Sequence, residues 1–194
     1  MRRSEFIENI NFNKRNSPRS VDEYLVRGSR PLNSAAIDEL KSQGIQTVIC
    51  LLRADKTYDA EISNVAAEKQ AVEAAGMKFV SIDMDERKSP SESDIQAFLS
   101  AVKTGGKSYA HCSAGRDRVG LMNAIYDFKI RGMTYEQSYC KYLEGGHDFV
   151  SWVNLDIFFF KYANGTLRAA EVAIHKALGN DHYAKWLYRK LKLA

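Results

Sequence analysis

The sequence contains the stretch Lys107-Ser-Tyr-Ala-His-Cys-Ser-Ala-Gly-Arg-Asp-Arg-Val-Gly120, which decides the fold. Its first five residues form a short apolar segment that predicts a β-strand, and residues 121–128 have the apolar spacing of a helix. The loop between them follows the carboxyl end of the strand, where open α/β sheets bind their ligands. The stretch therefore predicts an α/β fold with a ligand site in this loop.

The loop combines a cysteine and an arginine, Cys112 and Arg118, with five residues between them. A loop that opens a helix can aim several backbone N–H groups at one point, and the helix N-terminus adds partial positive charge there. Arg118 can add a bidentate fork to the same anion, and the thiolate of Cys112 would be stabilised in this field. The residues expected to bind the anion are Ser113, Ala114, Gly115, Arg116, Asp117 and Arg118. The alternative is a buried cysteine beside solvated arginines, which the helix dipole disfavours unless an anion is bound.

The stretch resembles the signature loop of the cysteine-dependent phosphatases, the protein-tyrosine and dual-specificity phosphatase superfamily. Their pattern is His-Cys, two variable residues, Gly, two variable residues, Arg, then Ser or Thr. The similarity extends upstream to Tyr24–Pro31, Gly44–Arg53 and Ser89–Asp94, so it covers roughly residues 22–144. The string Ala114–Arg118 is most similar to small bacterial members and to relatives that act on inositol phosphates, such as phytases of the tyrosine-phosphatase type.

The resemblance implies a central, mostly parallel sheet flanked by helices, with a helical C-terminal extension. It also implies a phosphomonoester hydrolase that works through a phosphocysteine at Cys112, with Arg118 holding the phosphate and no metal or cofactor. His111 is expected to orient the loop, with its ring pointing away from Cys112 across the strand pleat; a general-base role is the alternative. Val119 departs from the family, whose hydroxyl at this position helps the thiolate leave, so a weakly active phosphate-binding module is a further alternative.

The general acid of the resembled family is an aspartate on the loop after the preceding strand. Here that loop offers three carboxylates, Asp83, Asp85 and Glu86. The alternation over Met77–Met84 predicts that Asp83 still belongs to the strand, which favours Asp85 as the acid and leaves the other two as alternatives. Asp117 is not expected to be the acid, because its charge would repel a bound phosphate, and its side chain is expected to point outward.

Basic residues occur where the resembled fold has the rim of its pocket. They are Arg27, Arg30, Arg53, Lys56, Arg87, Lys88 and Arg116. Such a rim suits a substrate with more than one phosphate, and this favours inositol polyphosphates or phosphoinositides over phosphotyrosine. A phosphotyrosine pocket needs an aromatic wall instead, for which Tyr58 and Phe149 are candidates.

The length and composition fit one domain with a sizeable core. The chain has 194 residues, of which 45% are hydrophobic, and a net charge of +4 that suits an anionic substrate. We expect a polar arm over residues 1–20 and a single domain over 21–194, with a helical C-terminal part over 147–194. No nucleic-acid motif, metal-ligand spacing of the three cysteines or membrane span is present in the sequence. The resemblance to the phosphatases implies a phosphorylated small molecule or a phosphoprotein as the partner. A cytoplasmic location is the default, and a periplasmic or secreted one applies if a leader has been removed.

The remaining pattern alternates strands with helices, as a parallel sheet requires. The predicted strands are Glu23–Arg27, Ile45–Leu52, Met77–Met84 and Lys107–His111. The predicted helices cover residues 34–44, 59–75, 91–103, the segment from the loop to Gly132, 134–143, 149–163 and two stretches within 167–193.

Overall fold

The computed structural model describes residues 18–148, 151–179, 186 and 189–191. The described residues belong to two compact units. The sheet unit comprises Met1–Asp85 and Ser91–Gly115, and the helical unit comprises Glu86–Pro90 and Arg116–Ala194.

The sheet unit is built on five strands in the order β1-β2-β5-β3-β4. Their bounds are β1 Arg19–Ser20, β2 Leu25–Ser29, β3 Thr47–Cys50, β4 Lys78–Ser81 and β5 Ser108–Cys112. The strands β2, β5, β3 and β4 run parallel, and β1 is an antiparallel edge. The predicted α/β class with a mostly parallel sheet is confirmed.

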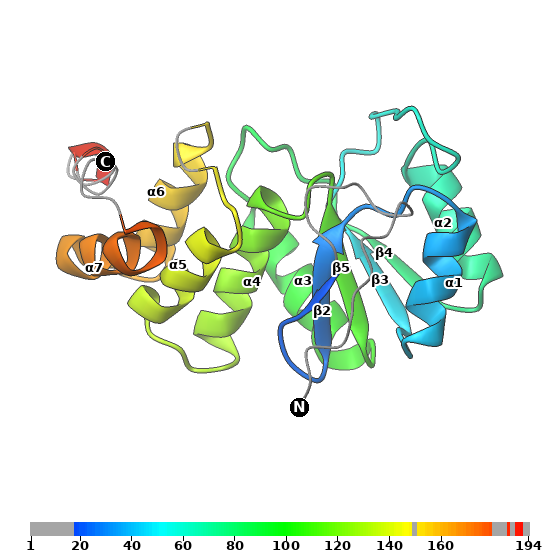
Figure 1. Cartoon of the computed structure of the whole chain (residues 1–194), viewed down its shortest axis with the longest axis horizontal. Coiled ribbons are helices and arrows are strands. Elements are labelled where there is room, and N and C mark those ends of the chain that lie inside the picture. The colour runs from blue at the N-terminus through cyan, green and yellow to red at the C-terminus, as the bar shows by residue number, and fades with distance from the viewer. Residues whose placement is uncertain (1–17, 149–150, 180–185, 187–188, 192–194) are drawn as a thin grey trace. The chain divides into compact units, whose positions relative to one another are not determined.

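Three helices of the sheet unit follow the parallel strands: α1 (Ser34–Ser42), α2 (Val65–Ala74) and α3 (Glu92–Thr104). Each begins at a side chain that accepts a backbone N–H of the first turn, namely Asn33, Asn64 and Ser91. α1 and α2 lie on one side of the sheet, and α3 packs against β3 from the other side (Figure 1). The strands β2, β5 and β3 are therefore buried along their whole length, whereas β4 at the edge of the sheet is only partly buried.

The register of the sheet decides where the loop residues point. Val26, Tyr109 and Val48 are aligned across three strands and belong to the core cluster that includes residues of α1 and α2. Because side chains alternate along a strand, His111 points to the same face as Tyr109, whereas Cys112 points to the opposite face. The sheet thus separates the ring of His111 from the sulfur of Cys112.

The helical unit contains α4 (Asp117–Lys129), α5 (Tyr135–Glu144), α6 (Val153–Tyr162) and α7 (Leu167–Leu178). α4 packs against α5 and α6, and α5 packs against α7. An aromatic cluster joins α5 to α6, with the rings of Tyr135 and Tyr139 stacked at 5.4 Å and Phe159 beside both. Thr134 and Gln137 form a capping box at the start of α5, the helix predicted over residues 134–143.

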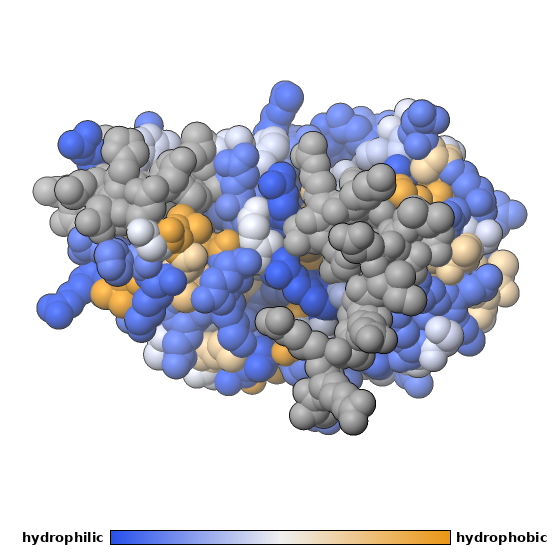
Figure 2. Space-filling model, in the orientation of Figure 1, coloured by the Kyte–Doolittle hydropathy of each residue, from blue (hydrophilic) through white to orange (hydrophobic). Residues whose placement is uncertain are grey.

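Polar residues predominate on the molecular face drawn in Figure 2, and the hydrophobic ones form only small patches there. Among the described residues, the large hydrophobic side chains that remain exposed are Tyr24 and Ile130. None of the described helices has the length and apolar character that a membrane span requires.

Three predicted elements differ from the structure. The predicted arm ends in β1, because Arg19 and Ser20 pair with β2, while residues 1–17 lie outside the described part. α2 begins at Val65 rather than near residue 59, because Asn64 caps the helix and Thr57 pairs with Asn64 in a bridge. β4 ends at Ser81, before Asp83.

Phe149 and most of the last predicted helix lie outside the described residues. The single domain over 21–194 stays a prediction.

Candidate active site

The first half of the loop, residues 113–115, belongs to the sheet unit and contacts the end of β2. Cys112 is the last residue of β5 and is 3% exposed. The carbonyl of Ser113 accepts the Arg30 N–H at 3.3 Å. Gly115 has φ +70°, and a Cβ there would lie 2.6 Å from the carbonyl carbon of Gly28. Only glycine fits this position, so the tight turn after Cys112 depends on it.

The second half of the loop, from Arg116, belongs to the helical unit and opens α4. The N-cap residue Arg116 has no side-chain oxygen that could accept the first N–H groups of the helix. This end of α4 has the character of an anion site. Arg118 lies in the first turn, and its Nη1 is 3.4 Å from Oε2 of Glu86. Glu86 is thus a counter-ion of the arginine that is predicted to bind phosphate.

The three candidate acids have different surroundings. Asp83 is exposed and already lies beyond β4, so the expectation that it belongs to the strand is wrong; the strand ends earlier than the alternating pattern. Asp85 is partly buried, with its Oδ2 3.6 Å from Nη1 of Arg53. Arg53 makes closer contacts with Asp55, at 2.9 and 2.6 Å. Asp85 and Asp55 therefore share this arginine. The choice of Asp85 over Asp83 and Glu86 stays a prediction.

A buried polar cluster lies behind the nucleophile in the sheet unit. Nε2 of His111 is 2.6 Å from Oε1 of Glu68, and the other carboxylate oxygen of Glu68 is 3.7 Å from Sγ of Cys50. Burial alone would lower the pKa of His111, but the charge of Glu68 outweighs it and raises that pKa well above its usual range. Sequence reasoning missed Glu68, although its spacing from Val65 and Val72 places it on the buried face of α2.

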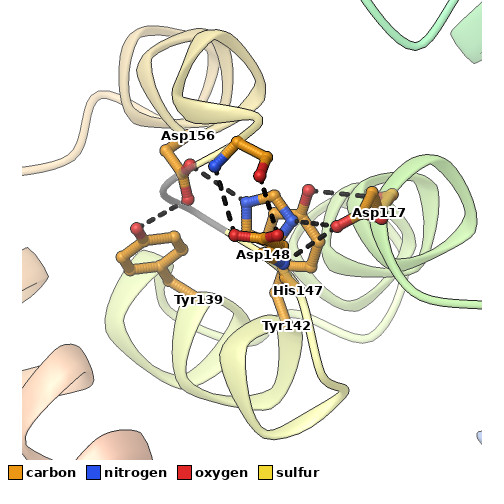
Figure 3. A network of polar contacts seen from close by, with 7 residues as sticks. Asp117, Tyr139, Tyr142, His147, Asp148 and Asp156 are labelled. Carbon is orange, nitrogen blue, oxygen red and sulfur yellow. Dashed lines mark hydrogen bonds and ion pairs between the residues drawn. The ribbon is translucent and has the colours of Figure 1, made fainter.

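Asp117 takes part in a second buried network, in the helical unit (Figure 3). Its Oδ1 is 2.9 Å from Nδ1 of His147 and also accepts the Asp148 N–H at 2.9 Å. Nε2 of His147 is 3.0 Å from Oδ2 of Asp156, whose other oxygen accepts the Tyr139 hydroxyl at 2.7 Å. The expectation that Asp117 points outward is wrong, because a histidine and a backbone N–H bind it inside the unit.

The two carboxylates keep His147 protonated. Burial by itself would lower the pKa of His147, but the charge of Asp156 and the hydrogen bond to Asp117 raise it to about 9. The same contacts with His147 and Asp148 lower the pKa of Asp117, against the opposite effect of burial. The network is therefore an Asp–His–Asp arrangement with a charged imidazole at neutral pH.

This network makes stability depend on pH. The pKa of His147 is about 9 in the folded protein and about 6.5 in an unfolded chain. Its contribution is therefore complete below pH 6.5 and is lost as the pH rises through 9; the difference corresponds to at most about 3 kcal/mol. We expect the free energy of unfolding in urea to fall over this range, and to fall less in His147→Gln. Equal slopes for the two proteins would contradict the assignment.

Two of the predicted rim cations are buried, contrary to expectation. Arg27 is 5% and Arg30 is 6% exposed. Arg30 donates to the Ile62 carbonyl at 3.0 Å and lies over the ring of Tyr58, 3.9 Å from its centroid. The guanidinium of Arg30 therefore covers one face of the Tyr58 ring, which was a candidate for the aromatic wall of the pocket. Lys56, Arg87 and Lys88 are exposed, and Arg116 is partly buried.

The fold and the loop define the class of protein, a cysteine-dependent phosphatase of the protein-tyrosine and dual-specificity superfamily. More narrowly, residues 15–147 match the family model described as PTP-SAK, Swiss Army Knife protein, DSP-PTPase phosphatase domain. The match covers more than half of the chain, and the chain belongs to this family.

Solved structures support the same fold. A DUF442 protein from Shewanella putrefaciens CN-32 is 22% identical, with a TM-score of 0.61, over 76% of this chain and 88% of that one. TpbA of P. aeruginosa is 16% identical, with a TM-score of 0.53, over 96% of this chain and 99% of that one. A second TpbA structure, a cysteine-to-serine variant in complex with pTyr, is 15% identical with the same TM-score, over 97% and 100%. A comparison with curated protein sequences gave no match.

Proposed function

We propose that the protein hydrolyses phosphomonoesters in two phosphoryl transfers through a phosphocysteine at Cys112. The observation that carries the proposal is the position of Cys112, at the carboxyl end of a central parallel strand and directly before the helix that carries Arg118. The membership of the phosphatase family gives this position its chemical meaning.

In the first transfer the thiolate of Cys112 attacks phosphorus, and the bond from phosphorus to the leaving oxygen breaks. Asp85 gives its proton to that oxygen. The guanidinium of Arg118 and the backbone N–H groups of residues 113–118 hold the equatorial oxygens, whose charge must be stabilised in the transition state. In the second transfer water attacks phosphorus and gives its proton to the carboxylate of Asp85, the sulfur–phosphorus bond breaks, and Cys112 returns to the thiolate.

For the substrate, we favour inositol polyphosphates or phosphoinositide head groups. This preference depends on the cations that the resemblance expects at the rim of the pocket, of which Lys56, Arg87 and Lys88 are exposed. Burial of Arg27 and Arg30 reduces the set of rim cations on which this preference depends. A second candidate is phosphotyrosine, which is favoured by the similarity to TpbA, a protein whose variant was solved in complex with pTyr.

A substrate panel separates the two candidates. We would compare kcat/KM for inositol hexakisphosphate, a soluble phosphoinositide head group and a phosphotyrosine peptide, all with a chelator present. We expect kcat/KM to be higher for an inositol phosphate than for the phosphotyrosine peptide. The double variant Arg87→Ala, Lys88→Ala should lower this ratio. A higher kcat/KM for the phosphotyrosine peptide, unchanged in the variant, would establish the second candidate instead.

Val119 is expected to slow the second transfer. It lies in the first turn of α4, fully buried, where the family has a hydroxyl that helps the thiolate leave. We expect Val119→Thr to speed hydrolysis of the phosphocysteine in single-turnover experiments with p-nitrophenyl phosphate. A wild-type burst that equals the enzyme concentration and then stalls would favour the weakly active binding module. An unchanged rate of the second step in the variant would show that the missing hydroxyl is not limiting.

A further inference from the structure

Glu68, His111 and Cys50 form a cluster that is almost completely buried in the sheet unit. Its residues come from α2, β5 and β3 and are 2%, 0% and 0% exposed. Cys50 and His111 are aligned partners in the parallel pairing of β3 with β5, so both side chains point toward α2. A carboxylate in such a place is costly unless a partner compensates its charge. His111 is that partner, and it directly precedes the nucleophile.

The ring of His111 joins Glu68 to the backbone of Cys112. Its Nε2 is 2.6 Å from Glu68, and its Nδ1 is 3.4 Å from the Cys112 carbonyl oxygen. Both neighbouring oxygens are acceptors, and only a protonated imidazole can donate to two acceptors at once. A neutral ring that donates to Glu68 would turn the lone pair of Nδ1 toward the carbonyl. The two contacts therefore favour the charged ring, and so does the charge of Glu68, which raises the pKa of His111.

The carbonyl of Cys112 sets the direction of the first N–H group of the loop. The peptide between Cys112 and Ser113 is planar and trans, because the structure has no cis peptide among its described residues. In a trans peptide the C=O and the following N–H point in opposite directions. A carbonyl held toward His111 thus directs the Ser113 N–H away from the α2 side, as a phosphate-binding N–H beside Cys112 requires.

We propose that Glu68 is a positioning residue of the phosphatase reaction, which through its hydrogen bond to His111 fixes the peptide plane between Cys112 and Ser113. The proposal rests on the proposed function, because it assigns this peptide to the phosphate-binding loop. Glu68 contacts neither the substrate nor the sulfur of Cys112; it acts through the ring of His111. The ring acts on the loop through the carbonyl of Cys112, and the carboxylate of Glu68 compensates the charge of the ring.

The groups around His111 are consistent with this role. Glu68 faces the ring from α2 and Cys50 from β3, and Tyr109 stacks on it within β5 at 5.7 Å. Arg30, after β2, is the further charge near Glu68. Burial raises the pKa of the Cys50 thiol, so Cys50 stays a neutral donor to the carboxylate.

Cys50, Glu68 and His111 are also residues that could bind Zn²⁺. A metal would have to displace the protons of both Cys50 and His111.

The test uses the full chain and the variant Glu68→Gln, which keeps the size of the side chain but removes its charge. Alkylation of Cys112 by iodoacetate is followed against pH by peptide mass spectrometry, and kcat and KM are measured with p-nitrophenyl phosphate. We expect the midpoint of alkylation to rise by about one pH unit and kcat to fall about tenfold, with little change in KM. The matched control Cys50→Ala, from the same cluster, is expected to change neither value appreciably.

An alkylation midpoint and a kcat that are unchanged in folded Glu68→Gln would overturn the proposal and leave the proposed function intact. If that variant does not fold, Glu68→Asp replaces it; the charge remains, but the shorter side chain moves away from Nε2, and an unchanged kcat would again overturn the proposal. A wild-type activity that a chelator abolishes and Zn²⁺ restores would overturn it in favour of a metal. Failure of Cys112 to react in the wild type would instead refute the proposed function.

Discussion

Replacement of Cys112 by serine is expected to abolish turnover while the protein still binds phosphate and substrate analogues. A serine hydroxyl in this loop has no base to activate it, so the first phosphoryl transfer loses its nucleophile. Loss of a covalent nucleophile typically lowers kcat by about 10⁴-fold or more. The loop geometry is kept, because the side chain differs by one atom and Gly115 still forms the turn. Steady-state kinetics and calorimetric titration with vanadate or phosphate measure the two effects separately.

Cys140 provides the matched control for this substitution. It lies in α5 and is partly exposed, and burial together with the charge of Glu144 raises its pKa to about 11. Cys140→Ser is therefore expected to keep wild-type turnover. If Cys112→Ser retained more than trace activity, or if it lost phosphate binding together with turnover although it remained folded, Cys112 would not be the nucleophile of an intact phosphate loop.

Replacement of Asp85 by asparagine is expected to give the second-largest loss, and one that depends on the leaving group. A well-placed general acid contributes about 10²–10⁴-fold to the rate. An inositol phosphate releases an alkoxide, which needs the proton, whereas p-nitrophenyl phosphate releases a stable phenolate. We therefore expect Asp85→Asn to lower kcat for inositol phosphates far more than for p-nitrophenyl phosphate. The phosphocysteine should still form in the variant, but slowly.

The two neighbouring carboxylates test this assignment. Asp83→Asn is expected to have little effect, because Asp83 is exposed beyond β4. Glu86→Gln is expected to change KM rather than the dependence on the leaving group, because Glu86 contacts Arg118 at 3.4 Å. A loss in Glu86→Gln that is confined to poor leaving groups, with none in Asp85→Asn, would transfer the role of acid to Glu86.

The fold could be predicted from the sequence because its strands carry strong local signals. The run Ile45–Leu52 and the strand before Cys112 lie in the centre of the sheet, where both faces are buried and the apolar pattern is nearly continuous. Boundaries were less predictable. The edge strand β1 has only two residues, and its pairing depends on β2 rather than on its own sequence. The start of α2 depends on the cap at Asn64, inside a segment whose helical composition extends further upstream.

The site was predictable where chemistry lies in one continuous segment, as in residues 111–118. It was not predictable where partners are distant in the sequence. Glu68 precedes His111 by a whole strand and helix, and only tertiary structure brings them together. His147 follows two glycines in a segment without a motif. The available signals were weak: a carboxylate on the apolar face of α2, and Asp156 within an apolar, aromatic segment of α6. A charged residue on a buried face indicates a partner of opposite charge, because an unpaired buried charge is costly.

Trapping the covalent intermediate tests directly whether Cys112 is the nucleophile. Enzyme and p-nitrophenyl phosphate would be mixed, quenched within the first turnover in neutral denaturant, and analysed by mass spectrometry of peptides. We expect one phosphoryl group on the peptide that contains Cys112, with its amount following the burst of nitrophenol, and none in Cys112→Ser. Turnover at full rate with no phosphorylated Cys112 at any quench time, or with the phosphoryl group on another residue, would contradict it.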